Sequence, residues 1–163
     1  LYEAGHITYM RTDGIDMAPE AVQEARAAIK DRFGDDYVPN SPRIYKNKAK
    51  NAQEAHECIR PTEMTMDAAK LKIRDDDQRK LYDLIWKRTL ASQMEAARLE
   101  RTTVDIASRD GQVELRATGQ VLLFDGFLKI YEEGRDDSSD DDDKRLPQIS
   151  KGEAAKKQEI TPE

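Results

Sequence analysis

Hydrophobic residues recur at helical spacing over residues 17–33. An apolar stripe repeats every three or four positions there, formed by Ala21, Val22, Ala25, Ala28 and Ile29. Asp16 is a candidate cap, Pro19 falls where a missing N–H is tolerated, and Glu20 adds negative charge to the first turn. Gly34 is a suitable stop. The pattern predicts a helix that supports the segment before it.

A second and clearer helical pattern covers residues 78–94. The positions at three-four spacing are Leu81, Leu84, Ile85, Arg88 and Ala91, and Trp86 and Leu90 widen the apolar face. We expect the tryptophan to lie in the core. A shorter helix is predicted over residues 65–73, with Thr65 as its cap and the charged cluster 74–77 as its end.

The period changes to two near residue 97. Leu99, Thr102, Val104 and Ile106 predict a strand, 109–111 a hairpin turn, and Val113, Leu115 and Ala117 the returning strand. Residues 119–124 extend that strand or begin another, and residues 146–149 and 154–160 are candidate edge strands. This change predicts an α+β chain, with a mainly helical domain at 1–95 and a β-rich domain at 96–163.

The charge of the chain is concentrated in one segment. The formal net charge is −6, and residues 132–143 contain eight acidic side chains and one basic side chain, or −7. The remainder is therefore nearly neutral, and we expect the acidic run to be a solvated loop. A basic stretch, 43–50, is a candidate contact for a phosphate backbone, although a solvated loop explains its composition as well.

Several function classes are excluded by missing motifs. His56-Glu57-x-x-Arg60 lacks the second histidine of a zinc hydrolase, and the consecutive aspartates 140–143 lack the spacing of an EF-hand. No glycine-rich phosphate loop occurs, which argues against nucleotide hydrolysis. Cys58 is the only cysteine, so neither a disulfide nor a cysteine-built zinc site is expected within this sequence. No apolar run is long enough for a membrane span.

Tyr9 and Arg11 are the candidate catalytic pair. In an extended segment, side chains two residues apart point to the same face. A phenolate can attack a phosphodiester while a guanidinium, whose planar fork matches phosphate oxygens, holds the phosphate. Such a pair is common, and alone it favours a structural role.

Two sequence blocks change this balance. Ile7-Thr8-Tyr9-Met10-Arg11-Thr12-Asp13 resembles the active-site tyrosine segment of bacterial type IA DNA topoisomerases, and residues 53–62, Gln-Glu-Ala-His-Glu-Cys-Ile-Arg-Pro-Thr, resemble a second motif of that family in the same order. The resemblance covers the whole chain, loosely in its last thirty residues. One departure is Gly14, where serine is frequent in the family; we expect this difference to change a local hydrogen bond rather than the chemistry.

The resemblance implies roles for five residues. Tyr9 would be the nucleophile that forms a 5′-phosphotyrosine link, and Arg11 would favour the phenolate and neutralise charge on the phosphate. Thr8, His56 and Arg60 would contact the DNA phosphate or its hydrogen-bond network. Arg60 is equally interpretable as a structural ion pair.

The resemblance also implies a setting for the chain. It would be an internal piece of an ATP-independent isomerase that relaxes negatively supercoiled DNA, with a catabolite-activator-like tyrosine domain followed by part of an arch. Mg²⁺ would bind to an upstream domain, so residues 1–163 alone would be inactive. The expected partners are single-stranded DNA and the remaining domains, in the bacterial cytoplasm near the nucleoid. A non-catalytic DNA-binding or interaction module is the alternative.

Overall fold

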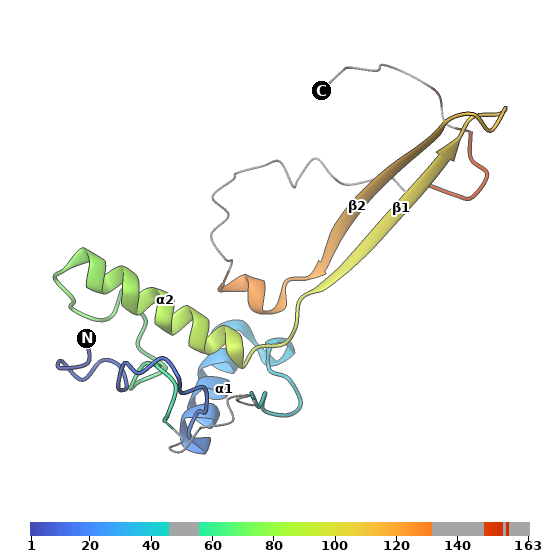
Figure 1. The fold of residues 1–163 in the computed structure, drawn as a ribbon. Helices are drawn as coiled ribbons and strands as arrows, with labels where there is room; N and C mark the ends of the chain where they lie inside the picture. The colour runs from blue at the N-terminus through green and yellow to red at the C-terminus, as the bar shows by residue number, and fades with distance from the viewer. Residues whose placement is uncertain (46–55, 132–148, 155, 157–163) are drawn as a thin grey trace. The chain divides into compact units, whose positions relative to one another are not determined.

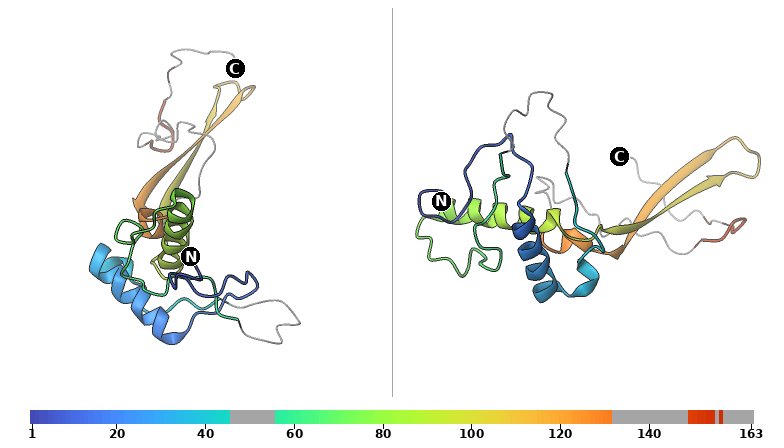
Figure 2. Two further views of the ribbon diagram at one scale, coloured as in Figure 1. Left: turned by 90° about the vertical axis from the view of Figure 1, so that its left-hand side faces the viewer. Right: turned by 90° about the horizontal axis from the view of Figure 1, so that it is seen from below.

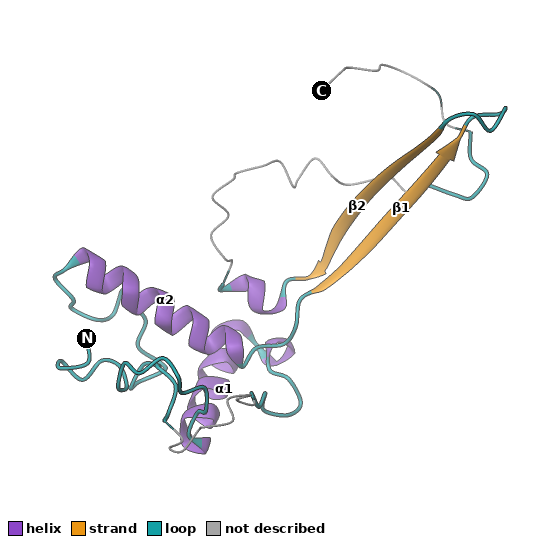
Figure 3. Ribbon diagram, in the orientation of Figure 1, coloured by secondary structure: helices purple, strands orange, loops and turns teal. Residues whose placement is uncertain are grey.

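The computed structural model describes residues 1–45, 56–131, 149–154 and 156. The chain divides into two compact units: Leu1–Ala97 together with Asp125–Gly134, and Arg98–Phe124 together with the residues that follow Gly134. The first unit carries both long helices and the second carries a β-hairpin (Figure 1; Figure 3). Mixed helix and strand are therefore confirmed. The acidic run, most of the basic stretch and nearly all of the two candidate edge strands fall outside the described residues.

Helix α1 spans Pro19–Phe33 and follows the predicted pattern closely. Its buried residues are Ala21, Ala25, Ala28 and Ile29. Pro19 begins the helix, Glu20 lies in its first turn, and Gly34 ends it, as predicted. The predicted cap is wrong, because Ala18 holds the N-cap position and its N–H is satisfied by a distant carboxylate, that of Glu57, at 3.1 Å.

Helix α2 spans Asp76–Ser92 and begins earlier than predicted. Asp75 caps it by accepting a hydrogen bond from the Gln78 amide, so part of the charged cluster starts this helix. The predicted apolar face is also displaced. Tyr82, Trp86, Thr89 and Leu90 are buried, whereas Leu81 and Leu84 are 50% and 47% exposed. The buried face is shifted by one position along the sequence, which is about 100° around the helix axis.

Polar atoms on two aromatic rings explain this choice of face. The Trp86 Nε1–H donates to the Met64 carbonyl at 2.8 Å, and the Tyr82 hydroxyl donates to the Met66 carbonyl at 2.7 Å. Burial raises the pKa of Tyr82 to about 12. Aromatic rings bury more surface than leucine and here also satisfy two carbonyls, so they outcompete the leucines for the core. The prediction that Trp86 belongs to the core is confirmed.

The helix predicted at 65–73 is wrong. These residues form turns, in which the Asp67 carboxylate accepts from the amides of Ala69 and Lys70 at 3.1 and 3.0 Å. Arg32 of α1 holds the same carboxylate through an ion pair of 2.8 Å. An aspartate that accepts from nearby backbone amides favours a turn over a helix interior.

Strands β1 (Arg98–Ala107) and β2 (Glu114–Phe124) form the predicted antiparallel hairpin, with residues 119–124 extending the second strand. Thr102, Val104 and Ile106 are partly buried on one face, while Leu99 lies on the other face and is 50% exposed. Asp105 and Arg116 form an ion pair of 2.6 Å across the strands.

The segment after the hairpin belongs to the first unit. A short 3₁₀ helix, η2 (Gly126–Lys129), follows β2, and the Phe127 amide donates to the Glu95 carbonyl at 2.9 Å. The Tyr37 hydroxyl donates to Asp125 at 2.7 Å, which raises the pKa of that phenol. The views in Figure 2 show η2 close to the C-terminal end of α2. The periodicity of the sequence did not predict that the chain returns to the first unit after the hairpin.

Candidate active site

The two sequence blocks lie against each other. Ile7 forms an antiparallel bridge with Pro61, and Asp16 forms a parallel bridge with Glu57. The backbone hydrogen bonds are Thr8 N–H to Arg60 O at 2.9 Å, Thr62 N–H to His6 O at 3.1 Å, and Cys58 N–H to Asp16 O at 2.7 Å. The residues between Thr8 and Asp16 therefore form a loop whose two ends are attached to the same short segment, 57–62.

Thr8 holds one end of this loop. Its hydroxyl donates to the Cys58 carbonyl at 2.7 Å and accepts from the Arg60 amide at 2.9 Å. Both interactions are with backbone groups of the second block. The geometry gives Thr8 a clear part in positioning the loop that carries Tyr9.

Gly14 holds the other end by close backbone contact. A Cβ at this position would lie 2.3 Å from the His56 carbonyl oxygen and 2.7 Å from that of Glu57. Contacts this short require a backbone shift, because both neighbours are main-chain atoms. Gly14 therefore affects more than the local hydrogen bond expected from the sequence, since it sets how closely the loop approaches His56.

Tyr9 is exposed on the loop. Its side chain is 56% exposed, and its ring packs edge-on against Tyr2 with ring centroids 5.3 Å apart. No regular secondary structure includes Tyr9 or the two residues after it. The phenol is thus accessible to a macromolecular substrate.

Arg11 connects the two blocks through its side chain. Its Nη1 lies 2.8 Å from His56 Nε2, and its Nε donates to Asp13 Oδ2 at 2.9 Å. Arg11 and Asp13 are each about half exposed. The structure thus brings together Arg11 and His56, two of the predicted site residues. No role was predicted for Asp13, although it lies in the same sequence block as Arg11.

Glu57 and Arg60 form a supporting network. Arg60 Nε donates to Glu57 Oε1 at 2.7 Å, and its Nη1 donates to the Pro61 carbonyl at 2.9 Å. Burial raises the pKa of Glu57, but the hydrogen bonds from Arg60 and from the Ala18 amide outweigh burial and leave this pKa lowered. The Arg60 side chain is only 14% exposed. Its contacts are those of a structural ion pair, which was the alternative to a phosphate contact in the interpretation of Arg60.

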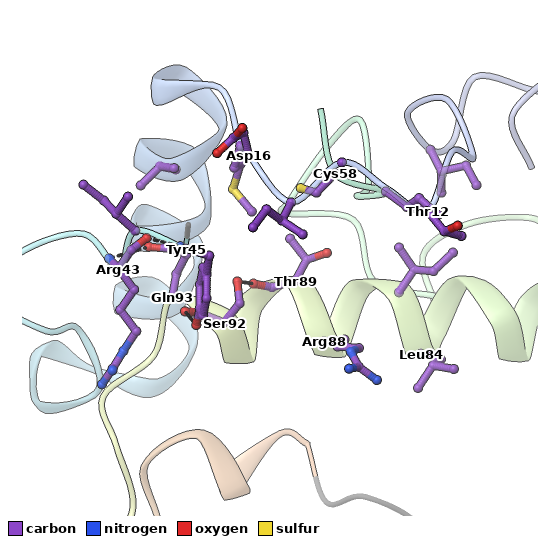
Figure 4. A pocket seen from close by; sticks show the side chains of 18 of the residues that line it. Thr12, Asp16, Arg43, Tyr45, Cys58, Leu84, Arg88, Thr89, Ser92 and Gln93 are labelled. Atoms are coloured by element: carbon purple, nitrogen blue, oxygen red, sulfur yellow. Dashed lines mark hydrogen bonds between the residues drawn. The ribbon is translucent and has the colours of Figure 1, made fainter. Parts of the chain in front are cut away.

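A cavity of about 770 Å³ lies beside the loop, between it and helix α2. Figure 4 shows Thr12 and Cys58 on one side, with Thr89 and Ser92 of α2 on the other. Burial raises the pKa of the Cys58 thiol. Tyr9, Arg11 and His56 are not among the residues that line this cavity.

Arg43, the first residue of the basic stretch, is tied to the end of α2. Its Nε donates to the Met94 carbonyl at 2.7 Å. Its backbone amide donates to the Gln93 side-chain oxygen at 3.2 Å (Figure 4). Lys46, Lys48 and Lys50 lie outside the described residues. Within the part of the chain that the structure describes, no group of three or more His, Cys, Asp or Glu side chains is arranged to hold a metal ion.

A phenol, a guanidinium and an imidazole are side-chain types that act on phosphate esters, and here the guanidinium of Arg11, two residues along the chain from Tyr9, meets the imidazole of His56. A family model described as DNA topoisomerase matches residues 1–163, and the chain belongs to that family. The protein called DNA topoisomerase 1 in Zymomonas mobilis is 53% identical over 165 residues, which cover 98% of this chain and 13% of that protein. The protein of the same name in Streptomyces coelicolor is 49% identical to this chain, and the match covers 99% of this chain and 18% of that protein.

A solved structure agrees with these relatives. Full-length topoisomerase I from Thermotoga maritima matches with a TM-score of 0.66 and 38% identity, over 80% of this chain and 20% of that one. The chain thus spans only about a fifth or less of the relatives it matches. No helix in the described ranges is long and apolar enough to cross a membrane.

Proposed function

We propose that residues 1–163 are the tyrosine-bearing part of a type IA DNA topoisomerase, in which Tyr9 cleaves one DNA strand. The observation that carries this proposal is the 2.8 Å contact between Arg11 and His56, which joins the two blocks beside the exposed Tyr9. The family relationship supports it, since the matched relatives are named DNA topoisomerase 1.

The chemical step is a transesterification. The Tyr9 phenolate oxygen attacks the phosphorus, a bond from that oxygen to phosphorus forms, and the bond to the 3′ oxygen breaks. The leaving 3′ oxygen takes up a proton, so the products are a 5′-phosphotyrosine and a 3′ hydroxyl. One phosphodiester replaces another, so the reverse attack reseals the strand without ATP after a strand has passed and negative supercoils have relaxed.

Arg11 and His56 act on the phosphate. A free phenol has a pKa of about 10, so the attacking oxygen needs help at neutral pH. The Arg11 guanidinium supplies a positive charge that favours phenolate and stabilises charge developing on the non-bridging oxygens. His56, which is hydrogen-bonded to Arg11, holds the guanidinium toward the same phosphate and can donate a hydrogen bond to a phosphate oxygen.

Thr8 and Arg60 contribute by positioning. The hydroxyl of Thr8 bonds to backbone atoms of the second block, and Arg60 is paired with Glu57. The phosphate-contact role implied for these two residues is thus indirect: they hold the loop and the segment that present Tyr9 and His56.

The wider assignment rests on the family resemblance. We assign residues 1–95 to the helical, catabolite-activator-like tyrosine domain and the chain from residue 96 onward, including the hairpin, to the arch, except that the segment beginning at Asp125 returns to the first unit. Mg²⁺ is held by another domain of the longer protein, so this piece alone does not cleave DNA. The partners are single-stranded DNA and the other domains, in the bacterial cytoplasm.

The test is covalent trapping of DNA by the full-length protein. A labelled single-stranded oligonucleotide is incubated with Mg²⁺, and the adduct is counted after denaturation. Tyr9→Phe should abolish the adduct and leave oligonucleotide binding within about twofold, since the ring is retained. Tyr2→Phe is the matched control, because Tyr2 packs against Tyr9 and is 44% exposed.

Three outcomes count against the proposal. An adduct that persists in Tyr9→Phe shows that another residue is the nucleophile. Binding without any adduct in the unmodified protein favours the non-catalytic DNA-binding module. Relaxation of plasmid by residues 1–163 alone contradicts the placement of the magnesium site elsewhere.

A further inference from the structure

Among the described residues, Asp13 is the one whose carboxylate is hydrogen-bonded to Arg11. Its Oδ2 accepts from Arg11 Nε at 2.9 Å, while His56 contacts Arg11 Nη1 at 2.8 Å. The two partners come from different segments and use different nitrogens of the guanidinium. The plane of a guanidinium held at two nitrogens is defined, because its donors have fixed directions.

Asp13 is itself held in place. Thr12 and Asp13 form a turn, and the next residue, Gly14, lies directly against the backbone of His56 and Glu57. Asp13 is therefore flanked by Arg11 on one side and by an anchored glycine on the other. Its carboxylate and the imidazole of His56 are carried by two segments whose spacing is set by that backbone contact.

We propose that Asp13 is a positioning residue that orients the Arg11 guanidinium toward the scissile phosphate; this inference rests on the proposed function. Occupation of Nε by Asp13 leaves the second terminal nitrogen, Nη2, and the remaining Nη1 donor to face the phosphate. These donors form one edge of the guanidinium, and bidentate recognition of phosphate oxygens needs two parallel N–H donors on one edge. Without Asp13 the guanidinium rotates about its side-chain bonds and presents that edge only part of the time.

The effect of Asp13 falls on rate and little on stability. Exposed ion pairs contribute only a small free energy to folding, and Arg11 and Asp13 are 51% and 54% exposed. Misplacement of a catalytic group by a fraction of an ångström to one ångström, however, slows a reaction by roughly ten- to a hundredfold. A large rate loss with an unchanged melting temperature is therefore the signature expected of Asp13.

The experiment measures single-turnover adduct formation by the full-length protein with Mg²⁺ and a labelled oligonucleotide. Asp13→Ala should slow adduct formation roughly tenfold or more, with unchanged thermal unfolding and unchanged oligonucleotide binding. Asp13→Asn keeps an oxygen acceptor for Nε and should recover most of the rate. The matched control is Asp35→Ala, which removes an exposed ion pair of 2.7 Å with Lys30 away from the loop.

A double-mutant cycle shows whether Asp13 acts through Arg11. Arg11→Lys retains the charge but has no Nε–H to orient, so adding Asp13→Ala should change its rate by less than about twofold. Three results overturn the inference: Asp13→Ala as fast as the unmodified protein, Asp13→Asn as slow as Asp13→Ala, or fully additive losses in the double variant. If Tyr9→Phe abolishes the adduct while Asp13→Ala has no effect, only this inference fails and the proposed function stands.

Discussion

Arg11 Nη1 lies 2.8 Å from His56 Nε2, although the two residues are 45 positions apart in the sequence. The contact is made possible by the pairing of Ile7 with Pro61 and of Asp16 with Glu57, which attaches both ends of the Tyr9 loop to the second block. The guanidinium and the imidazole are thereby brought together beside the loop that carries Tyr9.

Removal of the imidazole should weaken DNA cleavage. His56→Ala removes the partner of Arg11 Nη1, and we expect adduct formation by the full-length protein to slow by roughly ten- to a hundredfold. The side chain is only partly buried, so thermal unfolding should change little. Gel quantification of the covalent oligonucleotide adduct is the measurement, and equal rates for both proteins would show that His56 takes no part.

A methyl group at Gly14 should separate the two blocks. In Gly14→Ala the new Cβ meets the carbonyl oxygens of His56 and Glu57, so the loop must move, and we expect a loss of about 1–3 kcal/mol in the free energy of unfolding. Chemical denaturation measures this loss, and adduct formation should fall with it.

Gly5→Ala is the control for Gly14→Ala. Gly5 has a φ of +74°, but no atom lies within 4 Å of the place that a Cβ would take, so its substitution reports backbone strain alone, about 1 kcal/mol. A Gly14→Ala protein as stable as the unmodified chain would show that the close approach relaxes without penalty.

Glu57 should make the first unit sensitive to acid. Its pKa is lowered in the folded chain, so its stabilisation is fully present above the pKa of the unfolded state and is lost as pH falls through the lower folded value. Glu57→Gln should therefore lower the free energy of unfolding at pH 7 by about 1 kcal/mol and reduce the fall in stability below about pH 4.5.

Glu20→Gln is the matched control, because Glu20 lies in the first turn of α1, the helix whose N-cap amide donates to Glu57. It should lower the free energy of unfolding by only a few tenths of a kcal/mol, as expected for an acidic residue near a helix N-terminus. Denaturation measured from about pH 3 to about pH 8, a range that spans the carboxylate pKa, distinguishes the two. Parallel pH profiles for Glu57→Gln and the unmodified chain would contradict the assigned network.

Two leucines of α2 should respond very differently to truncation. Leu90 is 0% exposed, and Leu90→Ala should lower the free energy of unfolding by about 3 kcal/mol. Leu84 is 47% exposed, and Leu84→Ala should lower it by less than about 1 kcal/mol. Equal losses would mean that the buried face of α2 includes Leu84, as its spacing alone predicts.

Local patterns were sufficient for the elements themselves. The backbone hydrogen bonds of α1 and α2 join residues a few positions apart, and the two strands of the hairpin are adjacent in sequence and joined by a short turn. Their periods, Pro19, Gly34 and the turn at 109–111 are therefore readable from the sequence alone. The failed helix at 65–73 had the right spacing, but Asp67 accepts from its own neighbouring amides and pairs with Arg32, a partner that spacing does not reveal.

The sequence by itself determined α1, α2 and the hairpin, the two blocks and the candidates Tyr9, Arg11 and His56. Only the tertiary structure decided which face of α2 is buried, that Thr8 and Gly14 fasten the loop, that Glu57 completes the start of α1, and that Asp13 shares Arg11 with His56. The physical reason is that these are contacts between backbone and side-chain atoms far apart in the chain. Their geometry depends on distances that exist only once the segments have packed.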